Sequence, residues 1–212
     1  MGKHGQAALD AAQHLRSMII GGELRPGGHL REVQLAEQLE VSRNTLREAF
    51  RMLAQEGLIV HQPNSGAHVT TLSARTIGEI YALRRLMGLA AIREGVASPS
   101  ALAALRTATA QAHEARERGD GVALGTADLD FHRAIIALAG NSRMSALHET
   151  MLAELRLAFG AIDDPASFHA SFLPRNDEIL ARLSAGDRVG AERLLAEYLE
   201  LSETSVLAAQ GG

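Results

Sequence analysis

The clearest chemistry in this sequence belongs to two arginines, Arg43 and Arg47, which are spaced four residues apart. Residues four apart lie on the same face of an α-helix. A guanidinium group pairs bidentately with O6 and N7 of guanine, and a helix in the DNA major groove reads bases with its N-terminal residues. The spacing therefore predicts that both arginines read bases. The alternative is a solvated helix face on which they pair with Glu48 or other carboxylates.

Short polar side chains accompany the two arginines. Ser42 is a good N-cap for a helix that starts at residue 43. Ser42 and Thr45 also suit contact with DNA phosphates, because the free N–H groups and the dipole of a helix N-terminus favour an anion. Asn44 lies in the same first turn and completes this set of candidate DNA-binding residues.

The elements that would position these residues follow from apolar spacing. Helices are expected over 6–20, 32–39 and 43–56, with an apolar stripe on the third that points away from the arginines. Two short helices joined by a tight turn are typical of a helix-turn-helix. Two expected strands, 58–61 and 67–70, then flank a Pro-Asn-Ser-Gly turn and form a β-hairpin wing.

The remainder of the chain is almost entirely helical in pattern. Helices are expected over 73–96, 99–118, 121–140, 142–160, 167–185 and 187–208. Helices with short connections form an antiparallel bundle. The predicted fold is mainly α, with a winged helix-turn-helix domain over 1–72 and an all-helical domain over 73–212.

Composition supports this division and excludes several classes of protein. Of the 212 residues 46% are hydrophobic but only 3% aromatic, which favours helix packing over a β-sandwich. The absence of cysteine excludes disulfides and thiol nucleophiles. Residues 1–72 carry seven basic and seven acidic side chains, so the net charge of −4 belongs to the rest. With no leader pattern and no long apolar run, we expect a cytoplasmic protein without a membrane partner.

A second pair of residues could do chemistry in the helical part. Asp128 and His132 are four residues apart and would place a carboxylate and an imidazole on one helix face. This is half a metal site, or an acid and base for an enzyme, or a hydrogen-bonded pair. The enzyme alternative, metal-dependent or acid–base, has little support because the sequence shows no nucleophile motif and no phosphate-binding loop.

Residues 8–70 resemble a known family. The stretches that carry the resemblance are Ile19–Glu32, Leu35–Leu39, Val41–Ala49 and Glu56–Ile59, and together they are similar to the winged helix of GntR-type transcription regulators. The resemblance implies a homodimer on a palindromic double-stranded DNA operator, with wing residues around Gly66, including His68, reaching the minor groove. Val33 departs from the pattern, because some members have a DNA-contacting arginine there.

The helical part is similar to the FadR-type, or FCD, effector domain. The residues that carry this resemblance are Glu79–Leu86, Asp128–Ile135, Gly140–Asn141, Ile179 and Gly186–Asp187. Many members complete a metal site with two further histidines, where this chain has Asn176 and Tyr198. No cofactor is therefore expected to be required, and a zinc or nickel ion would have Asp128 and His132 at most. His148 and His169 could supply substitute ligands only if the bundle directs them inward, and both are instead expected at the surface.

The resemblance implies a ligand-responsive repressor whose bundle binds a small organic acid. Arg84 could hold the acid, with Asp128, His132, Asn176 and Tyr198 as the other effector-binding candidates. The alternative is that Arg84 pairs with Asp128 or another internal acid. Gly88 stands where members of the family usually have a glutamate, which indicates a remodelled pocket. A winged helix that serves protein contacts only is the remaining alternative.

Overall fold

The computed structural model describes residues 3–210 and divides into two compact units. The first unit runs to Leu72 and includes the short segment Arg156–Ala161, and the second comprises Ser73–Leu155 and the chain from Ile162. Within the described residues the elements are α1 (Lys3–Ile20), β1 (His29–Leu30), α2 (Glu32–Gln38), α3 (Arg43–Gln55), β2 (Ile59–Gln62), β3 (Gly66–Val69), α4 (Ala74–Glu94), α5 (Pro99–Glu117), α6 (Gly121–Ala137), α7 (Ser142–Phe159), α8 (Pro165–Ser184) and α9 (Arg188–Gln210).

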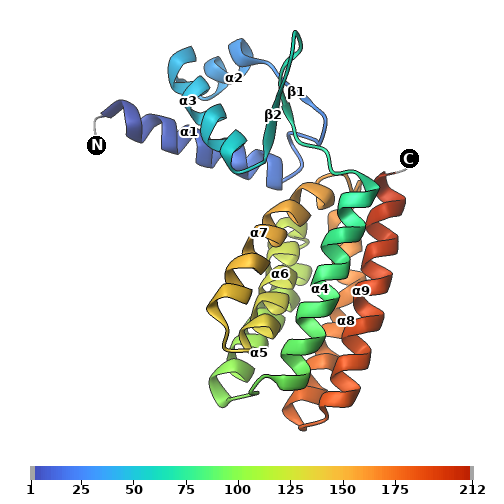
Figure 1. Ribbon diagram of the computed structural model, residues 1–212. Helices are drawn as coiled ribbons and strands as arrows, with labels where there is room; N and C mark the ends of the chain where they lie inside the picture. The colour runs from blue at the N-terminus through green and yellow to red at the C-terminus, as the bar shows by residue number, and fades with distance from the viewer. Residues whose placement is uncertain (1–2, 211–212) are drawn as a thin grey trace. The chain divides into compact units, whose positions relative to one another are not determined.

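The first unit is a winged helix built on the apolar stripe of α3. Its core joins residues of α1, α2 and α3 to the inner face of a small sheet (Figure 1). Leu46, Phe50 and Leu53 of α3 are fully buried in this core. Because these positions repeat at helical spacing, burying them leaves the opposite face of α3, which carries the arginines, exposed.

The sheet has three antiparallel strands in the order β1-β3-β2. The hairpin of β2 and β3 confirms the predicted wing. The third strand, β1, was not predicted, because a strand of two residues is too short to show a period. It pairs His29 with His68 and Leu30 with Ala67, and so fastens the segment before α2 to the wing.

The wing turn requires left-handed backbone at two positions. Asn64 has φ of 60° and Gly66 has φ of 83°. A Cβ atom on Gly66 would lie 3.0 Å from Nε2 of His29 on β1. Both the backbone angle and this close approach therefore favour glycine at residue 66.

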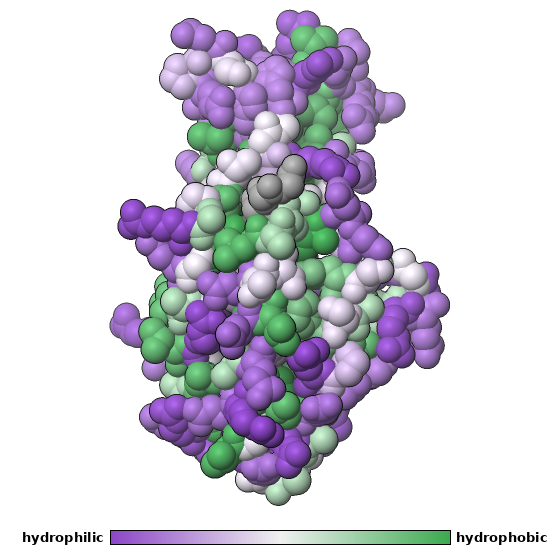
Figure 2. All heavy atoms as spheres, turned by 90° about the vertical axis from the view of Figure 1, so that its right-hand side faces the viewer, coloured by the Kyte–Doolittle hydropathy of each residue, from purple (hydrophilic) through white to green (hydrophobic). Residues whose placement is uncertain are grey.

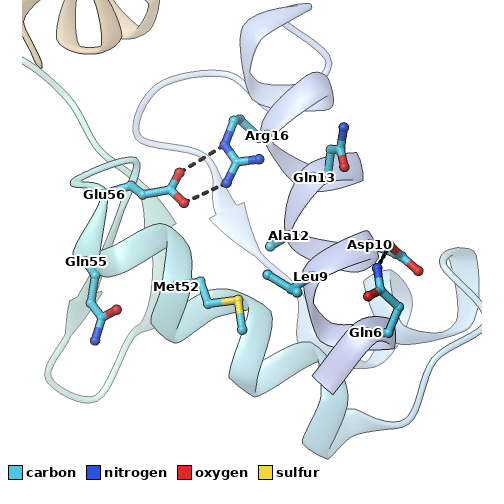
Figure 3. Close-up of a pocket in the computed structure, with 9 residues that line it drawn as sticks. All are labelled: Gln6, Leu9, Asp10, Ala12, Gln13, Arg16, Met52, Gln55 and Glu56. Atoms are coloured by element: carbon cyan, nitrogen blue, oxygen red, sulfur yellow. Dashed lines mark hydrogen bonds and ion pairs between the residues drawn. The ribbon is translucent and has the colours of Figure 1, made fainter. Parts of the chain in front are cut away.

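An ion pair joins α1 to the end of α3 (Figure 3). Nε and Nη2 of Arg16 donate to the two carboxylate oxygens of Glu56, at 2.9 and 2.6 Å. Leu9 and Met52 line the shallow hollow that lies between the two helices. Since both charged side chains are more than a third exposed, this bidentate pair orients the helices more than it stabilises them.

The second unit is a helical bundle, as predicted. In it α4 packs on α9 and α6, α5 packs on α6 and α8, and α8 packs on α9, so that the helices lie side by side (Figure 1). Side chains of Ser73, Ser98, Asp120 and Asp164 cap four of the helix N-termini. Each capping residue lies where the apolar pattern is interrupted between two helices. For this reason the predicted helix boundaries agree with the observed ones to within a few residues.

Hydrophilic and hydrophobic residues are interspersed over the face of the helical unit that Figure 2 shows. Some large apolar side chains of the helical unit, such as Leu86 and Val189, are exposed to solvent. None of the helices within residues 3–210 is long and apolar enough to cross a membrane.

The core position of Phe50 leads to a stability prediction. We expect F50A to lower the free energy of unfolding of the winged-helix unit by about 3–5 kcal/mol, because the truncation leaves a cavity in a closed core. Hydrogen exchange of the amides in α1 and α3 measures this. The exposed neighbour Arg51 provides the control R51A, and a loss below about 1 kcal/mol for F50A would show that the core closes around the gap.

Candidate functional sites

The first turn of α3 is capped as predicted. The Ser42 hydroxyl oxygen accepts a hydrogen bond from the Thr45 backbone N–H at 3.1 Å, and the two side-chain hydroxyls lie 2.8 Å apart. Arg43 and Asn44 follow directly and are exposed. Within the described residues Arg43 has no hydrogen bond or ion pair, so its guanidinium group is available to a partner outside the chain.

Arg47, one turn later, differs from Arg43. Its Nε donates to Oε2 of Glu32, the first residue of α2, at 2.9 Å. The side chains are 57% and 33% exposed. The sequence therefore anticipated that a carboxylate could pair with an arginine of this face, but the partner is Glu32 of the preceding helix and not Glu48.

The wing carries the remaining two DNA-binding candidates, and their surroundings differ. Gly66 is exposed at the turn, whereas His68 is only half exposed. Nδ1 of His68 lies 3.2 Å from the carbonyl oxygen of Gly27, and Nε2 lies 2.9 Å from the Ser65 hydroxyl. Its ring centroid is 4.9 Å from that of His29. Through these contacts His68 connects the wing to the segment before α2 and helps to fix the conformation of the wing.

The helical unit gathers its candidate residues around one buried carboxylate. Asp128 of α6 accepts a hydrogen bond from Nδ2 of Asn176 on α8 at 2.8 Å. The Tyr198 hydroxyl of α9 lies 2.8 and 2.9 Å from the two carboxylate oxygens. All three side chains are at most 4% exposed. The residues expected in place of metal-binding histidines therefore do meet Asp128, and they meet it as hydrogen-bond donors.

His132 and Arg84 complete this buried cluster. The His132 ring packs edge-on against Tyr198, with centroids 4.6 Å apart. Cζ of Arg84, on α4, lies 4.9 Å from the centre of the Tyr81 ring, whose hydroxyl is 2.7 Å from the Ser202 hydroxyl. No carboxylate among the described residues pairs with Arg84, so the expected alternative of an Arg84–Asp128 ion pair is not observed.

Two histidines expected at the surface are buried. His148 on α7 and His169 on α8 are 2% and 3% exposed, so that prediction was wrong. The sequence held a signal, because the buried Leu152 and Leu155 follow His148 at helical spacing. Nδ1 of His169 lies 3.6 Å from Oδ2 of Asp128.

Burial and the neighbouring charges set the protonation of the cluster. Burial alone would raise the pKa of Asp128, but the His169 and His132 imidazoles and the Asn176 amide hold the pKa of that carboxyl well below its usual range. Burial, followed by the positive charge of Arg84, lowers the pKa of His132 to about 3 and that of His148 to about 4. Burial and the Asp128 charge raise the pKa of Tyr198. Near neutral pH the cluster therefore holds an ionised Asp128 and neutral His132 and His148 imidazoles.

This donor set does not fit a transition-metal site. The oxygens of Asp128 already accept hydrogen bonds from an amide and a phenol, which are weak ligands for zinc or nickel. Over residues 3–210 there is no group of three or more His, Cys, Asp or Glu side chains placed to hold a metal ion.

Comparison with known sequences agrees with both units. Residues 7–69 match the family described as bacterial regulatory proteins of the gntR family, and residues 79–201 match the FCD domain. The chain belongs to the GntR family of transcription regulators and carries an FCD domain. The resemblance drawn from the motifs is thereby confirmed.

Individual relatives match this GntR-family regulator over different shares of its length. The Nta operon transcriptional regulator of Aminobacter aminovorans is 32% identical over 143 residues, covering 66% of this chain and 68% of the relative. The gluconate operon transcriptional repressor of Bacillus licheniformis is 42% identical over 76 residues, which is 36% of this chain and 31% of the relative. A crystal structure titled as a transcriptional regulator GntR from Rhodococcus sp. RHA1 is 37% identical with a TM-score of 0.84, covering 95% of this chain and 98% of that one.

The buried histidines lead to a prediction about pH. The unfolded chain binds a proton at each histidine near pH 6.5, whereas the folded chain does so at His148 only near pH 4. We therefore expect the free energy of unfolding to fall as the pH drops from about 6.5 towards 4, by up to about 1.4 kcal/mol per pH unit for each such histidine. Urea denaturation across this range measures the slope.

The variant H148Q should reduce that slope by up to one proton, since it removes one of the groups that protonates on unfolding. H14Q, at an exposed position of α1, is the matched control. An unchanged slope in H148Q would contradict the assignment of His148 as a buried neutral imidazole.

Proposed function

We propose that this GntR-family regulator is a homodimeric repressor that binds a palindromic operator and responds to a small organic acid. The observation that carries the DNA-binding half is the first turn of α3, where a capped helix N-terminus presents two exposed arginines on one face. In the major groove Arg43 and Arg47 read guanines, and Asn44 lies beside them at the base edges. Ser42 and Thr45 contact phosphates and set the register.

The wing takes the minor groove in this proposal. Gly66 lets the backbone approach the DNA closely, because it has no side chain and adopts a positive φ. His68 acts indirectly, through its contacts with Gly27 and Ser65 that hold the wing in shape. Two such units in a dimer bind half-sites about 34–36 Å apart, which is one turn of DNA.

Four unpartnered polar atoms support an effector site in the bundle. Nη1 of Arg84, Nε2 of His132, Nδ1 of His148 and Oδ1 of Asn176 are buried without a hydrogen-bond partner in the described part of the chain. A buried polar atom without a partner costs free energy, so a ligand that supplies partners binds favourably. The four atoms come from α4, α6, α7 and α8, so one ligand would join four helices.

Charge and hydrogen bonding narrow the chemical class of the effector. Arg84 is the one permanent cation of the cluster, and Asp128 is an anion already satisfied by Tyr198 and Asn176. Since Arg84 makes no ion pair with Asp128, its guanidinium group can pair with one ligand carboxylate, whereas a second ligand carboxylate would have no cation in the cluster to pair with. Because Oδ1 of Asn176 accepts only, the ligand also needs a hydroxyl or another donor. The best candidate is a hydroxylated monocarboxylic acid bound without a metal.

The same cluster is a poor catalyst, which favours a receptor over the alternative enzyme. General acid–base catalysis needs groups that titrate near the working pH. The pKa values of Asp128 and His132 are both lowered away from that range.

An effector changes DNA affinity only if it binds the DNA-competent and the DNA-incompetent states of the protein with different affinity.

The operator contacts can be tested with R43A. We expect about 10- to 100-fold weaker binding to duplexes that the wild-type protein selects from a random pool, because one bidentate base contact is worth about 1–3 kcal/mol. Electrophoretic mobility shifts measure the affinity. The control R106A changes an exposed arginine of α5 in the other unit. Equal affinity of R43A and R106A would remove Arg43 from the DNA contacts, and selected sites without two-fold symmetry would contradict the palindrome.

The effector class can be tested by thermal unfolding after exhaustive chelation. We expect lactate or gluconate to raise the midpoint, because a ligand of the folded state stabilises it, and R84Q to abolish the shift. Propionate and hexanoate lack the hydroxyl, and malate and glucarate add a carboxylate, so all four should shift the midpoint less. R106Q is the control variant. No shift with any of these acids would contradict an organic-acid effector, and a shift that appears only with added zinc or nickel would contradict metal-free binding.

A further inference from the structure

The two arginines of the exposed α3 face are held differently before DNA arrives. Arg43 has no partner among residues 3–210, whereas Nε of Arg47 is bound by Oε2 of Glu32 at 2.9 Å. Glu32 opens α2, and its carboxylate reaches across the turn of the helix-turn-helix to α3. An exposed pair of this kind contributes little to folding stability, so its effect must be sought elsewhere.

The atoms used in this ion pair determine what Arg47 can still do. A guanidinium group is a planar fork with five N–H donors. With Nε bound to Glu32, the two terminal nitrogens, Nη1 and Nη2, have no partner within the described chain. These two nitrogens are sufficient for a bidentate contact with O6 and N7 of one guanine.

Glu32 also has an unfavourable effect near DNA. A carboxylate beside the recognition helix repels phosphates and offsets part of the attraction of Arg47 for any DNA sequence. It also restricts the rotamers of Arg47, so less side-chain entropy is lost when the arginine meets the correct base. At the correct base the two effects oppose each other, whereas on other sequences only the repulsion acts.

We propose that Glu32 is a positioning residue for DNA readout, which aims the terminal nitrogens of Arg47 at one guanine per half-site and weakens binding to other sequences. Glu32 thereby lowers the overall affinity for DNA and raises the specificity for the operator. The inference rests on the proposed function, because it requires that Arg47 reads a base.

The test compares specificity and affinity in E32Q, with E48Q as a matched control. Glu48 is an exposed glutamate of α3 without a hydrogen bond or ion pair among the described residues, so E48Q removes the same charge. The probes are the duplex selected by the wild-type protein, the same duplex changed at the base pair where R47A loses discrimination, and an unrelated duplex. The specificity ratio is the affinity for the first divided by that for the second.

We expect E32Q to lower the specificity ratio about tenfold while binding the unrelated duplex as tightly as the wild type or more tightly. E48Q should leave the ratio unchanged. In the R47A background, E32Q should lower the ratio no further, because Glu32 acts through Arg47. Circular dichroism checks that each variant keeps its helical structure. A general structural defect would weaken binding to all three duplexes together.

The outcomes separate the two levels of the proposal. If R47A discriminates as well as the wild type at every base pair, Arg47 does not read a base, and both the proposed function of Arg47 and this inference fail. If R47A loses discrimination but E32Q behaves like E48Q, only the role of Glu32 is overturned. Independent, additive losses in E32Q and R47A would overturn it as well.

Discussion

The helical unit depends on one constraint, which is that a charged carboxylate lies in its interior. Asp128 is buried, and burying a charge is costly unless hydrogen bonds and neighbouring charges compensate. Asn176 and Tyr198 supply those bonds from two other helices, so satisfying Asp128 also fixes how α6, α8 and α9 face one another. Among the described residues, Nη1 of Arg84, Nε2 of His132 and Nδ1 of His148 remain buried without a hydrogen-bond partner.

The described residues of the winged-helix unit include no comparable buried charge, and this unit is organised by apolar packing. The stripe on α3 is buried against α1 and the sheet, and this burial turns the polar side of the helix outwards. Packing therefore decides which residues can meet DNA, and local ion pairs such as Arg47–Glu32 decide how they are held. The two units are therefore stabilised differently. The winged-helix unit exposes its charged side chains, whereas the helical unit encloses a charged carboxylate.

Much of this could be predicted from the sequence, and what could not has a physical reason. Helix boundaries were predictable because caps such as Ser42 and Ser73 and the apolar period act locally. The two-residue strand β1 was missed because it exists only through pairing with β3. The partner of Arg47 was missed because it depends on a contact between α2 and α3, which local spacing does not encode. The burial of His148 was missed although the apolar spacing of Leu152 and Leu155 indicated it.

The short strand β1 also affects how such a protein can change during evolution. At the wing tip, Pro63 has no partner strand, whereas Asn64 has a left-handed backbone and the Ser65 hydroxyl contacts His68. Gly66, however, lies against His29, and His29 pairs with His68, so these three positions from two distant stretches of sequence form one coupled unit. If the wing binds DNA as proposed, new preferences would therefore arise most readily at Pro63, while a side chain at Gly66 would meet both the positive φ and the His29 ring.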